Sequence, residues 1–177
     1  MLDLEKLSEY TKAVLAIVIG EHVIKMLPKD EGFLHSRKTL DLCWKCIEKW
    51  ENIEDDVIDD LCNCICSDND EEFEYYSKIS EDATNSNIYL LLCGIASYVG
   101  AQVMIEQEEA LPQYWEVVED DDGYIECVLD VVKIVNENYF EDYKLQQVLS
   151  YCQEKEKENQ KIRFHREEIL KIALLEA

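Results

Sequence analysis

The sequence predicts an all-α protein: a single-domain irregular bundle or array of about six to seven helices around a hydrophobic central helix. Three observations predict this class. Apolar residues recur at helical spacing, no segment sustains the period-two alternation of a strand, and residues 83–105 form an uncharged stretch of helix length. A chain of 177 residues that is 47% hydrophobic, with 5 Gly and 2 Pro, can bury one sizeable core. We therefore predict one domain, residues 1–177.

Three helices are predicted in the first part of the chain. The first runs over about residues 4–27 and ends at Pro28 and the run Asp30-Glu31-Gly32. The second begins at Phe33 and closes near Trp50. A short third helix covers residues 54–66, with acids in its first turn, where the helix dipole favours them. We expect residues 67–82 to form a mostly acidic loop with at most a helical turn near residues 73–79.

The uncharged stretch at residues 83–105 fits either a membrane span or a buried central helix. It contains polar residues such as Asn85, Asn87 and Gln102, and no Lys or Arg flanks it to anchor or orient it in a bilayer. A core helix is therefore the better interpretation. Its core residues are expected to be Leu90, Leu91, Ile95, Tyr98 and Val99.

Residues after the central helix predict a connection and further helices. Residues 111–123 form an ordered connection bounded by Pro112 and Gly123, and helices follow over residues 124–135 and from Asp142 through Cys152. Residues 153–161 carry no apolar side chain, so they either extend an exposed helix or form a linker. We expect residues 153–177 to be this polar stretch and a long terminal amphipathic helix that packs on the body or on a second copy, giving a monomer or weak homodimer.

Eight cysteines raise the question of a metal site. No basic region precedes the first apolar run, so we predict a cytoplasmic protein with reduced thiols. Cys43-x2-Cys46 followed by Cys62-x-Cys64-x-Cys66 approaches a four-cysteine zinc pattern, but the second half lacks the usual spacing. On a helix, Cys64 would face the core and Cys66 nearly the opposite side. Core packing is the preferred reading, with zinc binding or redox chemistry as the alternatives.

Other catalytic or cofactor sites find little support in the sequence. His22, His35 and His165 are far apart and match no paired-ligand spacing, and the glycines form no phosphate-binding loop. We predict no cofactor, no metal and no catalytic residue. A helical metal-dependent hydrolase using clustered carboxylates remains the enzyme alternative.

The net charge of −23 is concentrated in one segment. Residues 1–50 hold 8 acids and 8 bases and residues 133–177 hold 9 acids and 8 bases, whereas residues 51–132 hold 23 acids and Lys78 alone. Such a charge disfavours nucleic acid and anionic membranes as partners and favours a basic protein. The alternative is a set of solvated acidic helix ends and loops.

Aromatic residues lie beside the acids, a mixture typical of an interface with aromatic anchors and an electrostatic rim. Tyr75 and Tyr76 follow one acidic cluster, and Tyr114 and Trp115 precede another. The alternative is that these aromatics belong to the core. The predicted partner-binding residues are Asp55, Asp56, Asp59, Asp60, Asp70, Glu71, Glu72, Tyr75, Trp115, Glu119, Asp120, Asp121 and Asp122.

Two segments carry a resemblance to a known family. The resemblance is carried by EGFLHSRKTLDLCWKCIEKW, at residues 31–50, with its DLCW step, followed by the uncharged helix and then ALPQYWEVVEDDD, at residues 110–122. The chain resembles the immunity protein 6 family of bacterial polymorphic-toxin systems over about residues 7–135. The resemblance implies a cytosolic, all-helical antidote without catalytic residues. Its partner would be the C-terminal domain of a cognate toxin encoded beside it. The cysteine patch at residues 61–66 and the polar tail are not features of that family.

Together these observations predict an immunity protein that neutralises a toxin domain through an acidic surface. The first alternative is an acidic adaptor or nucleic-acid mimic without a toxin partner, which would show the same charge and helix content.

Overall fold

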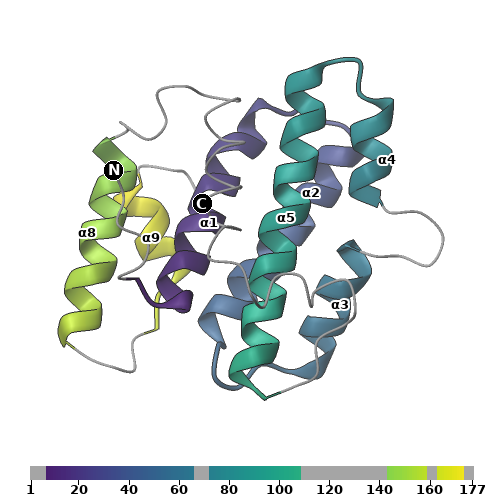
Figure 1. The fold of residues 1–177 in the computed structure, drawn as a ribbon. Helices are drawn as coiled ribbons and strands as arrows, with labels where there is room; N and C mark the ends of the chain where they lie inside the picture. Colours follow the sequence, from purple (N-terminus) through teal and green to yellow (C-terminus); the bar gives the residue numbers. More distant parts are fainter. Residues whose placement is uncertain (1–6, 66–71, 109–142, 159–162, 174–177) are drawn as a thin grey trace.

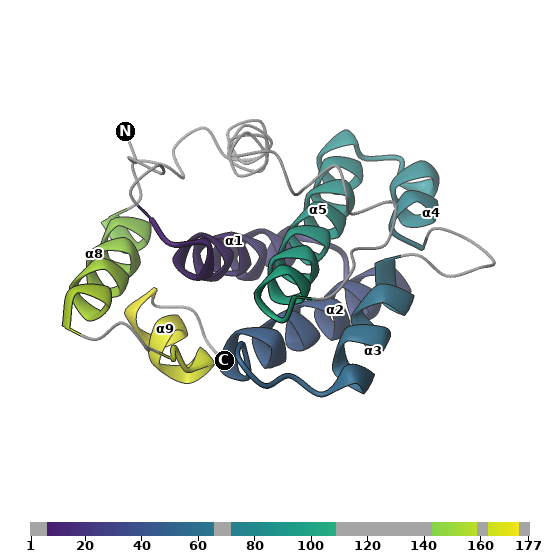
Figure 2. The ribbon, with the colours of Figure 1, turned by 60° about the horizontal axis from the view of Figure 1, so that its bottom comes forward.

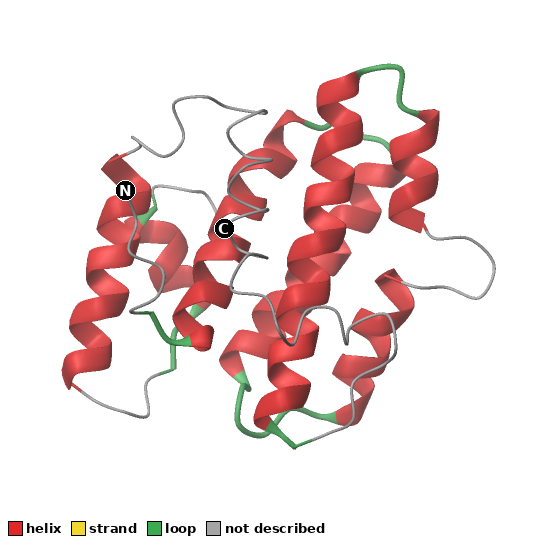
Figure 3. Cartoon of the chain, viewed as in Figure 1, coloured by secondary structure: helices red, strands yellow, loops and turns green. Residues whose placement is uncertain are grey.

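The computed structural model describes residues 7–65, 72–108, 143–158 and 163–173. Within these ranges every regular element is a helix, and no strand occurs (Figure 3), which confirms the predicted all-α class. The elements, shown in Figure 1, are α1 (Glu9–Val23), the 3-10 turn η2 (Ile24–Met26), α2 (Glu31–Glu48), α3 (Asp55–Ile65), α4 (Glu72–Ile79), α5 (Ala83–Glu106), α8 (Tyr143–Glu158) and α9 (Arg166–Ile172).

Helix α5 occupies the centre of the larger group of helices, as the sequence predicts. It contacts α1, α2, α3 and α4. Within its most apolar stretch of 18 residues, 72% is buried inside the protein. By length and composition alone α5 could cross a membrane, and it is the one such helix among the described residues. Its burial against four other helices makes it a core helix instead.

Helix α1 lies between two groups of helices. Figure 2 shows α2, α3, α4 and α5 on one side of it, and α8 and α9 on the other. Twelve of its 15 residues are buried, so α1 is apolar around nearly its whole circumference. The apolar run AVLAIVIG, residues 13–20, is therefore explained by the position of α1 between the two groups of helices.

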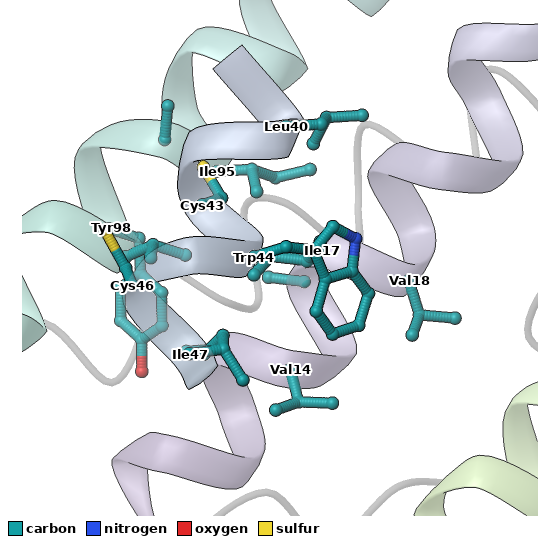
Figure 4. Packing of buried hydrophobic residues seen from close by; sticks show 14 of the residues in the cluster. Val14, Ile17, Val18, Leu40, Cys43, Trp44, Cys46, Ile47, Ile95 and Tyr98 are labelled. Atoms are coloured by element: carbon teal, nitrogen blue, oxygen red, sulfur yellow. The ribbon is translucent and has the colours of Figure 1, made fainter. Parts of the chain in front are cut away.

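The main core forms where α1, α2 and α5 meet. In Figure 4, Ile17 of α1, Trp44 and Ile47 of α2 and Ile95 of α5 lie close together, and each is at most 2% exposed. Dense packing of this kind accounts for most helix stability, because isolated helices of these lengths are marginal in water.

Capping residues place the first two helices differently from the sequence prediction. Helix α1 begins at Glu9 instead of residue 4, because the Ser8 hydroxyl accepts a hydrogen bond from Thr11 N at 3.1 Å. Asp30 accepts a hydrogen bond from Phe33 N at 3.1 Å and caps α2. Glu31 and Gly32 consequently start α2, and the prediction that they end the first helix is wrong.

Two further expectations are corrected around α4 and α5. Residues 72–79 form a helix of eight residues instead of mostly loop, because Phe73 is buried at 1% exposure with its ring 4.7 Å from that of His35. Leu90, expected in the core, is 50% exposed. Its predicted neighbours Leu91, Ile95, Tyr98 and Val99 are buried.

The C-terminal region contains two helices instead of one long terminal helix. Helix α8 extends through the polar stretch to Glu158, while residues 163–165 are non-helical. The reason lies at Phe164, which is 1% exposed and donates its backbone N–H to Tyr10 Oη at 2.8 Å. Burying this ring turns the chain back toward α1, and Ile169 and Leu170 of α9 are then buried as well.

Candidate partner-binding surface

Helix α3 presents one apolar face and one acidic face. Val57, Ile58, Leu61, Cys64 and Ile65 are buried, in contact with α2 and α5. The opposite face carries four exposed aspartates: Asp55, Asp56, Asp59 and Asp60. Burial of the apolar face therefore orients all four predicted carboxylates toward solvent.

Among the described residues these aspartates form no ion pair with a basic side chain, although the charge of Asp56 acts on Lys49. The nearby Lys49 ammonium instead binds Glu54 at 2.6 Å. Asp55 and Asp56 lie in the first turn, where the helix dipole favours a negative charge. Asp59 and Asp60 lie one turn further on, where they repel the first pair at the i,i+4 spacing. The face carries a negative charge that the fold itself does not neutralise.

Only part of the predicted surface lies within the described residues. Helix α4 contacts α3 and carries Tyr75, whose side chain is 50% exposed. Glu72 begins the same helix. The remaining predicted contacts lie outside the described residues: Asp70, Glu71, Trp115, Glu119, Asp120, Asp121 and Asp122.

Acids elsewhere in the structure are used differently. Glu21 of α1 is 2% exposed, and its carboxylate accepts hydrogen bonds from Arg37 at 2.5 and 2.7 Å and from Trp44 Nε1 at 2.8 Å. Arg166 of α9 approaches the same carboxylate at 3.3 Å and Asp41 at 2.8 Å. This network, which we call the Glu21 cluster, joins α1, α2 and α9 through Arg37 and Arg166.

The cysteines mostly pack in the core. Cys43, Cys46, Cys64 and Cys152 are buried and Cys62 is half-buried, whereas Cys66 lies outside the described residues. In the part of the chain that the structure describes, no three His, Cys, Asp or Glu side chains come together as a metal site would need. His35 Nε2 instead lies 3.0 Å from the Cys64 carbonyl oxygen. Packing against α3 thus accounts for the position of His35.

Burial also affects the chemistry of the thiols. It raises the pKa of Cys46 and of Cys152 to about 12, and it raises the pKa of Cys43 well above its ordinary value. We expect these three thiols to react slowly with iodoacetamide at pH 8 in the folded protein and quickly in urea, because the thiolate is the nucleophile. Peptide mapping by mass spectrometry measures both rates. Equal rates in the two states would contradict the buried positions.

The same shift gives a pH dependence of stability. The unfolded thiol has an ordinary pKa of 9.0, so it loses its proton at a lower pH than the folded thiol. The stability contributed by the protonated thiols is present below about pH 9 and is lost as the pH rises toward 12.

A family model described as Immunity protein Imm6 matches residues 11–134, more than half of the chain. The chain belongs to the Imm6 immunity protein family. This confirms the resemblance carried by the DLCW segment and the residues after α5. No curated protein and no solved structure matches the chain significantly.

Membership in Imm6 places the chain among the immunity proteins of toxin systems and indicates a role without catalysis. The match begins at Thr11 within α1, includes α2 to α5 and covers all the predicted acidic positions, so the candidate surface lies within the family's shared region. Helices α8 and α9 lie beyond the match.

Proposed function

We propose that this protein neutralises a cognate toxin by binding the toxin's C-terminal domain through the acidic surface of α3 and α4. The observation that supports the proposal is the exposed face of α3, where Asp55, Asp56, Asp59 and Asp60 are exposed to solvent and form no ion pair with a described basic side chain. Tyr75 supplies an exposed aromatic side chain on α4, a helix that contacts α3.

The charge distribution supports a basic partner surface. Within residues 51–132 only Lys78 opposes 23 acids, and Lys78 pairs with Glu74 at 2.5 Å on its own helix. A concentrated negative potential accelerates docking onto a positive surface, by roughly 10- to 1,000-fold at low salt. A toxin that acts on nucleic acid would carry such a surface in its substrate cleft, and the acidic face would occlude it by occupying the place of phosphates.

The proposal is tested by co-expression with the C-terminal domain encoded by the adjacent open reading frame. Survival of the host and co-purification of the complex are expected. If the neighbouring domain is toxic and the protein neither binds it nor protects the host, the immunity proposal for this pair is wrong. Failure to bind a nontoxic neighbour would favour the acidic adaptor.

Reversing charge at the centre of the acidic face is expected to slow association. The double variant Asp59→Lys/Asp60→Lys should reduce the association rate constant at least about tenfold at low salt and weaken its dependence on ionic strength. Stopped-flow or surface plasmon resonance measurements at several salt concentrations check this expectation.

A matched control separates local from global electrostatics. Glu154→Lys/Glu158→Lys makes the same change in net charge on the exposed side of α8, outside the proposed surface. At 0.1 M salt it should alter the rate by less than about threefold and by less than Asp59→Lys/Asp60→Lys does at the same salt, since exposed charges more than about 10 Å apart are largely screened there. Equal effects of the two double variants would show that net charge, and not the face of α3, governs binding.

A further inference from the structure

A pocket of about 290 Å³ opens where the start of α2, the end of α4 and the start of α5 meet. Its lining residues include the loop that joins α4 to α5, which is at the top of Figure 1. None of its lining residues belongs to the predicted surface, although α4 contributes to both. The residues that decide its chemistry are Asp30, Tyr76, Ile79, Glu81, Asp82 and Tyr89.

Two tyrosine rings form the inner wall. The rings of Tyr76 and Tyr89 have centroids 5.7 Å apart, and Tyr89 is 3% exposed. Gly32, in the first turn of α2, permits this packing. A Cβ atom at this position would lie 2.5 Å from Tyr89 Oη and 3.0 Å from Tyr76 Cδ1, closer than contacting atoms allow. The glycine lets the helix backbone and both rings approach closely, so the wall is held in place before anything binds.

Three carboxylates surround these rings. Asp30 caps α2 through Oδ1, and Asp82 caps α5 by accepting hydrogen bonds from Thr84 N at 2.7 Å and Asn85 N at 3.2 Å. The capping bonds satisfy the helix N-termini and fix both side chains at the pocket. Glu81 is exposed at its edge. Burial, followed by the charge of Asp30, raises the pKa of Tyr89 to about 12, and a hydrogen bond between the Tyr89 hydroxyl and Asp30 contributes to the shift.

No described Lys or Arg side chain lines the pocket. The two nearest in sequence are engaged elsewhere. Lys29 holds its ammonium 3.4 Å from the ring centroid of Phe33, and Lys78 binds Glu74. The pocket therefore combines aromatic walls with three formal negative charges and no internal cation.

We infer that this pocket receives an arginine side chain of the bound toxin. A planar guanidinium stacks on a tyrosine ring and donates several N–H groups to carboxylates at once, which a lysine ammonium does less well. The volume lies at the lower limit for small-molecule sites, so it suits one inserted side chain. Ile79, 57% exposed at the pocket, offers apolar contact around the inserted residue. Arginine is also among the residues that dominate interface energetics.

The inference rests on the proposed toxin binding and is tested first in the complex. Glu81→Lys places a competing cation at the pocket and should weaken toxin affinity at least tenfold, whereas Glu154→Lys on α8 should change it less than twofold. Both variants alter net charge equally. An unchanged dissociation constant for Glu81→Lys would overturn the inference.

A second measurement tests the pocket without the toxin. N-acetyl-arginine amide, titrated into the free protein, should produce saturable NMR shifts of the Tyr76 and Tyr89 ring signals that disappear in Glu81→Lys. Unperturbed rings, or equal binding of N-acetyl-lysine amide, would overturn the assignment to arginine. A protein that fails to bind the toxin but shows these shifts would disprove the proposed function while retaining the cation pocket.

Discussion

Removal of residues 143–177 is expected to abolish cooperative folding, although α8 and α9 lie beyond the family match. These helices cover the side of α1 that faces away from α2 and α5 (Figure 2). Polar contacts join them to α1, including Glu156 with the Ser8 and Thr11 hydroxyls and Phe164 N with Tyr10 Oη. The side chains that they bury are Leu145, Val148, Leu149, Cys152, Phe164, Ile169, Leu170 and Ala173.

The magnitude of this burial decides the expected result. Each fully buried Leu, Val, Ile or Phe side chain contributes roughly 1.5–3 kcal/mol. The large apolar side chains of α8 and α9 together contribute about as much as the whole net stability of a typical domain, about 5–15 kcal/mol. Truncation also exposes the apolar residues of α1 to water, so the remaining chain should aggregate or lose its native packing.

Urea unfolding followed by circular dichroism measures the effect. The chain ending at residue 142 should show no cooperative transition, and Phe164→Ala in the full chain should lower the free energy of unfolding by about 3–5 kcal/mol. Glu167→Ala, an exposed neighbour on α9, is the control and should leave the midpoint nearly unchanged. A cooperative transition of full-length stability in the truncated chain would contradict this role for α8 and α9.

Glu21→Ala is expected to cost about 3–5 kcal/mol of folding free energy. The substitution leaves Arg37 and Arg166, whose side chains are 24% and 27% exposed, with Asp41 as their one remaining carboxylate in this network. It also removes the acceptor of the buried Trp44 N–H. Two partly buried arginines then share the more exposed carboxylate of Asp41, and the buried Trp44 N–H lacks its acceptor. Incomplete compensation of buried charge and a buried unsatisfied donor are both costly, which explains the size of the expected loss.

The same unfolding measurement checks this expectation against an exposed ion pair. Glu51 pairs with Arg163 at 3.3 Å on the surface, so Glu51→Ala should leave the free energy of unfolding nearly unchanged. A cost below about 1 kcal/mol for Glu21→Ala would mean that water or another side chain replaces the lost carboxylate. Arg166→Met tests the coupling to α9 separately, because it removes one cation while keeping an apolar stem.

The helices themselves could largely be predicted from the sequence. Their apolar periodicity, Pro28 and the uncharged residues 83–105 are local signals, and the described helices of the first part of the chain lie close to the expected ranges. The connection expected at residues 111–123 and the helix expected over residues 124–135 lie outside the described residues. The acidic face of α3 was also predictable, because Val57, Leu61 and Cys64 alternate with Asp59 and Asp60 at a spacing that separates them onto two sides of a helix. Errors arose at helix ends, where a single cap such as Ser8 decides the boundary.

Contacts between distant residues could not be predicted in this way. Glu21 and Arg166 are 145 positions apart, and Gly32 meets Tyr89 only because α2 and α5 pack closely at their N-termini. Leu90 looks like a core residue by composition and is exposed, since no described helix covers its side of α5. Local periodicity determined which segments are helical and which faces are acidic or apolar. The packing of those helices decided which buried charges pair, where the pocket opens and which side of α1 is covered by α8 and α9. Such contacts depend on interhelical geometry, which no short stretch of sequence encodes.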